Sequence, residues 1–73
     1  MESKKDKFIR LAESRTNKVI EGLVLLSNLS SLKNYEYELD QIKQIFKAID
    51  KQLNITKAMF RKNEDKSRFR LKK

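Results

Sequence analysis

The stretch that decides the fold class runs from Leu39 to Arg61 and reads LDQIKQIFKAIDKQLNITKAMFR. Its apolar side chains, together with one threonine, keep the spacing of an amphipathic helix, and charged side chains lie between them. We therefore predict a helix over about residues 39–61. The positions that form this apolar pattern are Leu39, Ile42, Ile45, Phe46, Ile49, Leu53, Thr56 and Phe60.

A second amphipathic pattern runs from about Lys5 to Asn28. Ser3 precedes it and Asp6 follows three residues later, which is the spacing of a capping box at the start of a helix. Gly22 lies inside the pattern, where glycine costs up to about 1 kcal/mol relative to alanine. Close approach of another helix would compensate for it, and a local break is the alternative. The apolar positions are Phe8, Ile9, Leu11, Ala12, Val19, Ile20, Leu23, Val24, Leu25 and Leu26.

The residues between the two patterns favour a turn. Asn28 to Asn34 reads NLSSLKN, and serine and asparagine side chains compete for nearby backbone groups and so end helices. The whole chain has no proline and one glycine, which argues against an all-β fold. We predict an all-α protein in which a loop joins the two helices as a long antiparallel helical hairpin.

The chain is too short to be stabilised by a large core. It has 73 residues and neither cysteine nor histidine, which removes disulfides and the usual zinc ligands. Small proteins that lack disulfides and metal sites usually depend on association with another chain for their stability. The apolar pattern of the first helix also covers more than one face. We expect self-association or a protein partner to complete the fold.

Positive charge is concentrated at the C-terminal end. The formal net charge is +8, and residues 57–73 hold eight basic and two acidic side chains of this total. Residues 62–73 lose the helical apolar periodicity, so we predict a helical hairpin over residues 1–61 and a basic, flexible tail over residues 62–73. A short third helix in the tail is the alternative.

The composition argues against independent catalysis. Nucleophilic triads need a base such as histidine, and a glycine-rich phosphate loop needs more than one glycine. We expect no enzyme activity, no cofactor and no metal site. The longest apolar run, Leu23 to Leu26, is far shorter than the roughly 20 residues of a membrane span, and no secretory signal pattern begins the chain. We expect a cytoplasmic protein that does not enter membranes.

The basic end is the candidate nucleic-acid-binding site. Lysine and arginine neutralise phosphates, and an aromatic ring between arginines, as in Arg68-Phe69-Arg70, stacks on unpaired bases. Single-stranded DNA is the favoured ligand, and a solubilising tail is the alternative. The candidate residues are Arg61, Lys62, Lys66, Arg68, Phe69, Arg70, Lys72 and Lys73.

The second half of the first helix is the candidate protein-binding site. It holds more apolar side chains than one neighbouring helix can cover, and two tyrosines follow it in the loop. The tyrosines have an alternative role as anchors that pack over the end of the hairpin. The candidate residues are Val19, Ile20, Leu23, Leu26, Tyr35 and Tyr37.

Three short motifs carry a resemblance to a known group of proteins: Arg15-Thr16-Asn17-Lys18, Asn28-Leu29-Ser30 and Asn34-Tyr35-Glu36-Tyr37. Over residues 7–60 the chain resembles small helical proteins carried by plasmids, phages and cassette elements of Gram-positive bacteria. Where that group commonly has threonine or serine as the cap of the second helix, this chain has Glu38. Asp40 is therefore an alternative cap.

Within this group the chain is similar to the small proteins of staphylococcal cassette replication modules. The resemblance implies a family-A DNA polymerase as the partner and support of primer synthesis as the role. We therefore expect a non-catalytic accessory protein of mobile-element DNA replication or transfer. The alternatives are a homodimeric helical regulator that binds DNA and an inhibitor of a host or rival protein.

Overall fold

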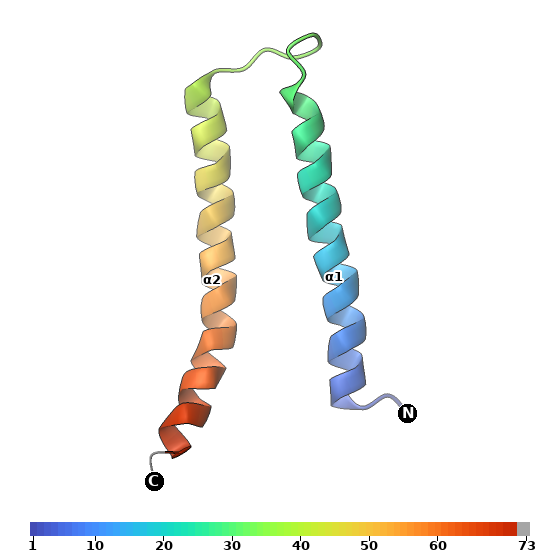
Figure 1. Cartoon of the computed structure of the whole chain (residues 1–73), viewed down its shortest axis with the longest axis vertical. Helices are drawn as coiled ribbons and strands as arrows, with labels where there is room; N and C mark the ends of the chain where they lie inside the picture. Colours follow the sequence, from blue (N-terminus) through green and yellow to red (C-terminus); the bar gives the residue numbers. More distant parts are fainter. Residues whose placement is uncertain (72–73) are drawn as a thin grey trace. The chain divides into compact units, whose positions relative to one another are not determined.

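The protein is all-α, as the sequence predicts. The computed structural model describes the backbone of residues 1–71 and the side chains of residues 1–63. It contains helix α1 (Lys4–Ser27), a short 3-10 helix η1 (Asn28–Ser30) and helix α2 (Leu39–Leu71), and no strand occurs in residues 1–71 (Figure 1). The chain divides into two units, Met1–Glu36 and Tyr37–Lys73. The antiparallel pairing of the helices stays a prediction.

Helix α1 begins where the capping signal predicts. Ser3 has extended backbone angles, and its hydroxyl oxygen accepts the backbone N–H of Asp6 at 3.1 Å. The backbone N–H of Lys7 adds a bond to the carbonyl of Ser3 at 2.9 Å. These two bonds satisfy N–H groups that the first turn of a helix leaves without intrahelical partners.

Gly22 does not break α1. The helix runs continuously from Lys4 to Ser27, so the predicted alternative of a local break is wrong. A Cβ placed at Gly22 would meet no heavy atom of the described residues within 4 Å. The position is therefore open on its outer side, and a partner helix can approach the backbone closely there.

The loop after α1 uses the serine and asparagine chemistry that the sequence predicts. The hydroxyl of Ser27 donates to the carbonyl of Val24 at 2.6 Å, at the point where the α-helix gives way to η1. The carbonyl of Ser31 then accepts the backbone N–H groups of Asn34 at 3.3 Å and Tyr35 at 3.0 Å. These bonds form a turn over residues 32–34, and residues 35–38 continue without regular structure.

Helix α2 begins at Leu39 and is capped through Glu38. The carbonyl of Glu38 accepts the N–H groups of Gln41 at 3.1 Å and Ile42 at 3.3 Å, and the amide oxygen of Gln41 accepts the N–H of Glu38 at 2.8 Å. The bond from the N–H of Glu38 to the side chain of Gln41 is one of the two bonds of a capping box, in which a side chain of the first turn accepts the N–H of the cap residue. Asp40 lies inside the first turn, so the predicted alternative of an Asp40 cap is wrong.

Helix α2 ends ten residues later than the predicted end at Arg61. It continues to Leu71, so most of the backbone of residues 62–73 belongs to the same helix as residues 39–61. A separate third helix in this segment is therefore not what the structure shows. The reason is the lack of a breaker, because residues 62–71 contain neither glycine nor proline. The predicted flexibility of the segment stays a prediction.

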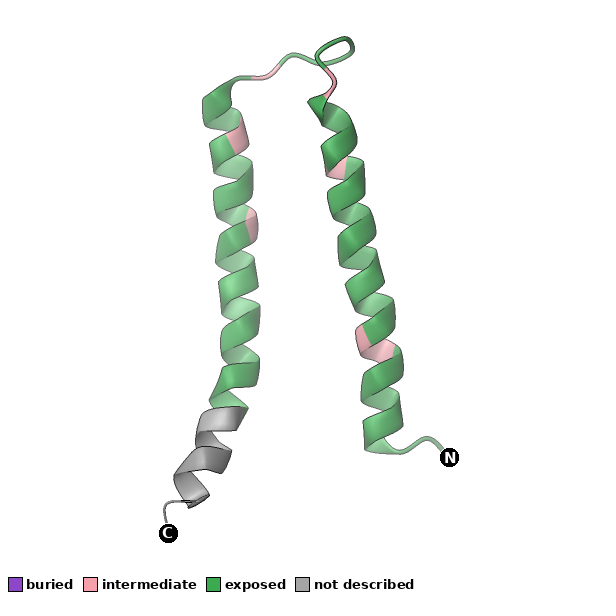
Figure 2. Cartoon of the chain, in the orientation of Figure 1, coloured by how far each residue is buried: buried purple, intermediate pink, exposed green. Residues whose placement is uncertain are grey.

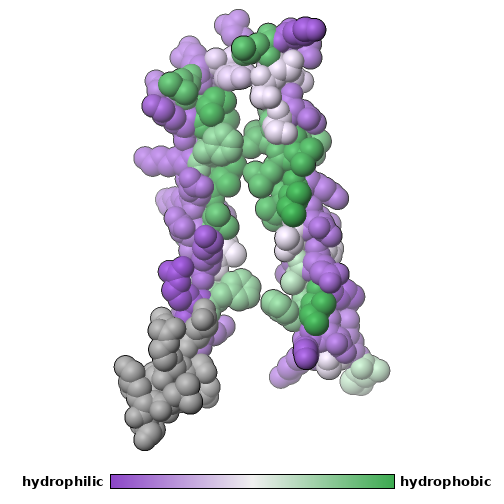
Figure 3. Space-filling model, in the orientation of Figure 1, coloured by the Kyte–Doolittle hydropathy of each residue, from purple (hydrophilic) through white to green (hydrophobic). Residues whose placement is uncertain are grey.

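No side chain among residues 1–63 is buried. Figure 2 shows that these residues are exposed except for a few of intermediate exposure. Those few are Leu11, Ala12, Leu26, Ser31, Tyr37, Ile42 and Ile49. Figure 3 shows apolar side chains gathered along one side of each helix and hydrophilic side chains on the other. Each helix therefore has an apolar side that its own backbone cannot cover.

Candidate functional site

The predicted protein-binding residues of α1 form one exposed patch, which we call the α1 patch (Val19, Ile20, Leu23 and Leu26). Val19, Leu23 and Leu26 are four and three residues apart, and Ile20 is three before Leu23, so all four lie on neighbouring positions of one helix side. Val19 is 63 % exposed and Leu26 is half-buried. The patch presents aliphatic carbon to the surroundings near the end of α1.

The two predicted tyrosines belong to different units. Tyr35 is 47 % exposed and is the second N–H donor to Ser31 in the turn that follows η1, so it lies in the same unit as the α1 patch. Tyr37 is half-buried and belongs to the unit of α2. The turn therefore ties Tyr35 to the unit that contains the α1 patch.

Helix α2 carries a longer apolar surface, which we call the α2 stripe (Leu39, Ile42, Phe46, Ile49, Leu53, Thr56 and Phe60). Phe46 and Leu53 are each 48 % exposed. Thr56 is the one polar member, and its hydroxyl donates to the carbonyl of Gln52 at 2.9 Å. That bond within the helix satisfies the hydroxyl and lets a threonine sit on an apolar side.

Two exposed apolar residues of α2 do not belong to the predicted pattern. Ile55 and Met59 are 48 % and 62 % exposed and lie four residues apart. Met59 lies beside the α2 stripe, three residues after Thr56, whereas Ile55 lies on the other side of the helix, near Lys51 and Lys62. The only signal for them in the sequence is the spacing of Ile55 and Met59, which are four residues apart. Met59 therefore widens the surface that a partner of the α2 stripe would cover, and Ile55 does not.

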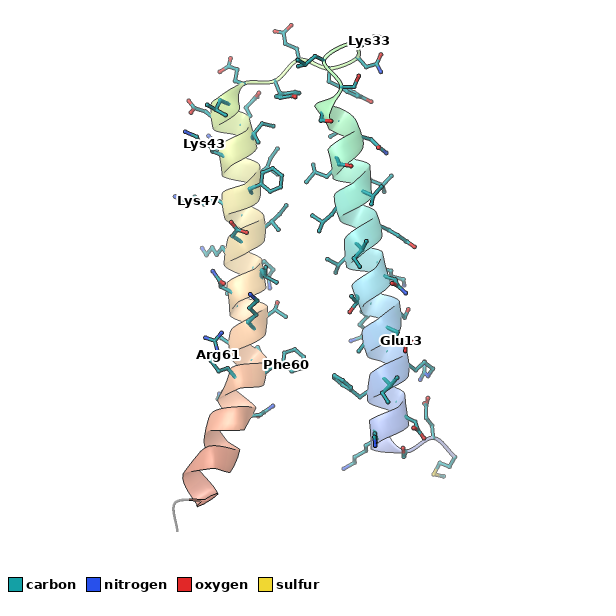
Figure 4. The ribbon with its side chains drawn as sticks, viewed as in Figure 1. Glu13, Lys33, Lys43, Lys47, Phe60 and Arg61 are labelled. Carbon is teal, nitrogen blue, oxygen red and sulfur yellow. The ribbon has the colours of Figure 1, made fainter. Side chains whose placement is uncertain are left out.

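Two of the predicted nucleic-acid-binding residues lie in the described part of the chain. Arg61 and Lys62 are both exposed on α2. Figure 4 shows Lys43, Lys47 and Arg61 projecting from one side of α2 and Phe60 projecting from the opposite side. Lys47 and Arg61 therefore lie away from the α2 stripe and remain accessible when that stripe is covered, whereas Lys43 directly follows Ile42 and lies at the edge of the stripe.

This arrangement defines a basic outer face on α2 (Lys47, Lys51, Arg61 and Lys62), in which Lys47 and Lys51 extend the predicted nucleic-acid site. All four side chains are exposed. A helix repeats about every 3.6 residues, so the four positions fall on the side opposite the stripe or at its edge. Basic charge thus extends along the helix before residue 62.

The other predicted nucleic-acid-binding residues fall outside the described side chains. Lys66, Arg68, Phe69 and Arg70 lie within the bounds of α2, and Lys72 and Lys73 follow it.

One ion pair lies at the N-terminal end of α1. The guanidinium of Arg10 donates to both carboxylate oxygens of Glu2, at 2.8 Å and 3.0 Å. The hydrogen bond that Arg10 donates to Glu2 raises the pKa of Arg10, which is charged at any physiological pH in either case. Both side chains are exposed, so the pair contributes little to stability.

Other kinds of site are not found in the described residues. They contain no group of three or more histidine, cysteine, aspartate or glutamate side chains that would hold a metal ion. None of their helices has the length and apolar character that crossing a bilayer requires. A scan against models of protein families, a search of curated proteins and a search of solved structures each found no match to this chain.

Proposed function

We propose that the chain is a non-catalytic accessory protein of DNA replication or transfer on a mobile element. It docks on a larger enzyme through the α1 patch and contacts single-stranded DNA through the basic outer face and C-terminal end of α2. The observation that carries this proposal is the pair of separate exposed surfaces, one aliphatic on α1 and one basic on α2.

The aliphatic surface supports docking on a protein. Each large aliphatic side chain gains about 1.5–3 kcal/mol when it is moved from water into an apolar contact. The four residues of the α1 patch therefore offer several kcal/mol to a partner with a complementary groove. A helix that lays one apolar side into a groove is a common mode of peptide recognition.

The basic surface supports binding to a polyanion. Four exposed basic side chains lie on the outer face of α2, and the sequence adds five more between residues 66 and 73. A surface of this kind attracts nucleic acid over about a Debye length, near 8–10 Å at ordinary salt. Single strands suit it better than a duplex groove, because no short helix-turn-helix is present in residues 1–71.

The resemblance in the sequence supports a particular enzyme class. It favours a DNA polymerase of family A as the partner, with the chain assisting the start of primers. In this role the protein would hold the template strand near the polymerase, which raises the local concentration of the strand. The protein would act in the cytoplasm.

The test is capture of the partner from the host that carries the chain. A tagged chain with wild-type sequence is expected to retain a replication or transfer enzyme, and Leu23→Asp is expected to lose it because a carboxylate cannot enter an apolar contact without cost. Leu32→Asp is the matched control, since Leu32 is 75 % exposed in the loop, outside the α1 patch.

Two results would count against the proposal. One is capture that returns no replication or transfer enzyme. The other is tight, sequence-specific binding to duplex DNA by the chain alone, which would instead favour a DNA-binding regulator.

A further inference from the structure

The α2 stripe has the heptad spacing of a coiled coil. Leu39, Phe46, Leu53 and Phe60 are seven residues apart, and Ile42, Ile49 and Thr56 form a second series, each three residues after a member of the first. These two series are the a and d positions of a heptad, which face a partner helix. A stripe this regular, running through the described part of a 33-residue helix, fits another long helix.

Charge alternates along one flank of this stripe. The e positions, which follow each d position, are Lys43, Asp50 and Lys57, and the sequence continues with Glu64. The opposite flank, the g positions, holds Ile45, Gln52 and Met59 and is uncharged in the described residues. Lys43, Asp50 and Lys57 form no ion pair with another described residue, so their charges are available to a partner.

An alternating flank is complementary to itself when the partner helix runs in the opposite direction. Reversing one helix of a pair brings its e flank against the e flank of the other. Asp50 then faces Lys57 of the second copy, and Lys57 faces Asp50 of the second copy. The centre of this register lies between Leu53 and Asn54, close to the middle of α2.

Other arrangements match these charges less well. In a parallel pair each e position faces a g position of the partner, and the described g positions of α2 carry no charge. Helix α1 matches the flank only in part, because its acidic residues Asp6 and Glu13 are complementary to the lysines of the α2 flank but not to Asp50. Carboxylates at those positions offer no pairing for Asp50.

We infer that the α2 stripe is covered by the α2 stripe of a second copy of this chain, in an antiparallel pair. The apolar stripe supplies the affinity of this pair, and the alternating flank selects the second copy and its direction. The inference goes beyond the proposed function and does not depend on it. The α1 patch and the basic outer face of α2 remain free in such a dimer.

The test exchanges the two charges that face each other. Sedimentation equilibrium of the wild-type chain is expected to show a monomer–dimer equilibrium. Asp50→Lys and Lys57→Asp each place like charges opposite one another twice, so each is expected to weaken the dimer about tenfold. An equimolar mixture of the two variants restores opposite charges across the pair and should dimerise as well as the wild type. The double variant should do the same.

A control separates pairing from general charge effects. Lys51→Asp makes the same change of charge as Lys57→Asp but lies on the basic outer face, away from the flank, so it should leave the dimer unchanged. Circular dichroism of each variant checks that the helices form. Three results would overturn the inference: a wild-type chain that stays monomeric at millimolar concentration, a mixture as weak as its two components, or equal damage from Lys51→Asp and Lys57→Asp.

Discussion

Ser3 is the residue whose removal should affect α1 most directly. Its hydroxyl accepts the N–H of Asp6 in the first turn, so Ser3→Ala should lower the stability of α1 by about 1 kcal/mol. Circular dichroism during heating measures the loss as a lower midpoint. Ser3→Asp is the control, because aspartate caps a helix as well as serine does. Equal loss in both variants would contradict the role of the hydroxyl.

Gly22 should respond in the opposite direction. Its Cβ position is open and its backbone is helical, so Gly22→Ala should stabilise α1 by about 1 kcal/mol through a smaller loss of backbone freedom. The measurement is again the helical signal and its midpoint. If a partner helix approaches the backbone at Gly22, the same variant should bind that partner more weakly. A fall in helicity in Gly22→Ala would contradict the predicted stabilisation of α1.

At the scale of the elements, the C-terminal end of α2 should determine much of the salt dependence of DNA binding. Truncation after Asn63 removes five basic and two acidic residues. Each phosphate contact to a single strand contributes about 0.7 to the slope of log affinity against log salt, so loss of three to five contacts should flatten the slope by about 2–3.5. A titration on a labelled strand compares both chains.

The same titration separates the outer face of α2 from its C-terminal end. If the truncated chain keeps an unchanged slope, the segment 64–73 is only a solvated end, and the binding rests on Lys47, Lys51, Arg61 and Lys62. Phe69→Ala in the full chain should cost about 1–3 kcal/mol if the ring stacks on a base. An unaltered affinity would exclude stacking by that ring.

At the scale of the whole molecule, docking and self-association should be separable. Leu23→Asp changes the α1 patch and should abolish capture of the enzyme while the dimer persists. Lys57→Asp changes the flank of α2 and should weaken the dimer while capture persists. Sedimentation and affinity capture on the same two variants give both readings. Loss of both activities in either variant would mean that one surface serves both partners.

Much of the local structure could be predicted from the sequence, because helix formation depends on residues three and four apart. The apolar spacing located both helices, Ser3 marked the start of α1, and the serine and asparagine run marked the turn. The cap of α2 was harder to predict. Glu38 is not a residue type that usually caps a helix. Its role as the cap depends on the side-chain amide oxygen of Gln41, which accepts the N–H of Glu38.

The sequence alone determined that this protein is all-α, because its helical periodicity and near absence of glycine and proline are local properties. The structure decided how far α2 extends and which apolar residues stay exposed. Residues 62–71 carry no apolar period, yet the helix continues through them since nothing interrupts its backbone hydrogen bonds. Exposure of Ile55 and Met59 likewise depends on their place around a formed helix, which composition does not specify.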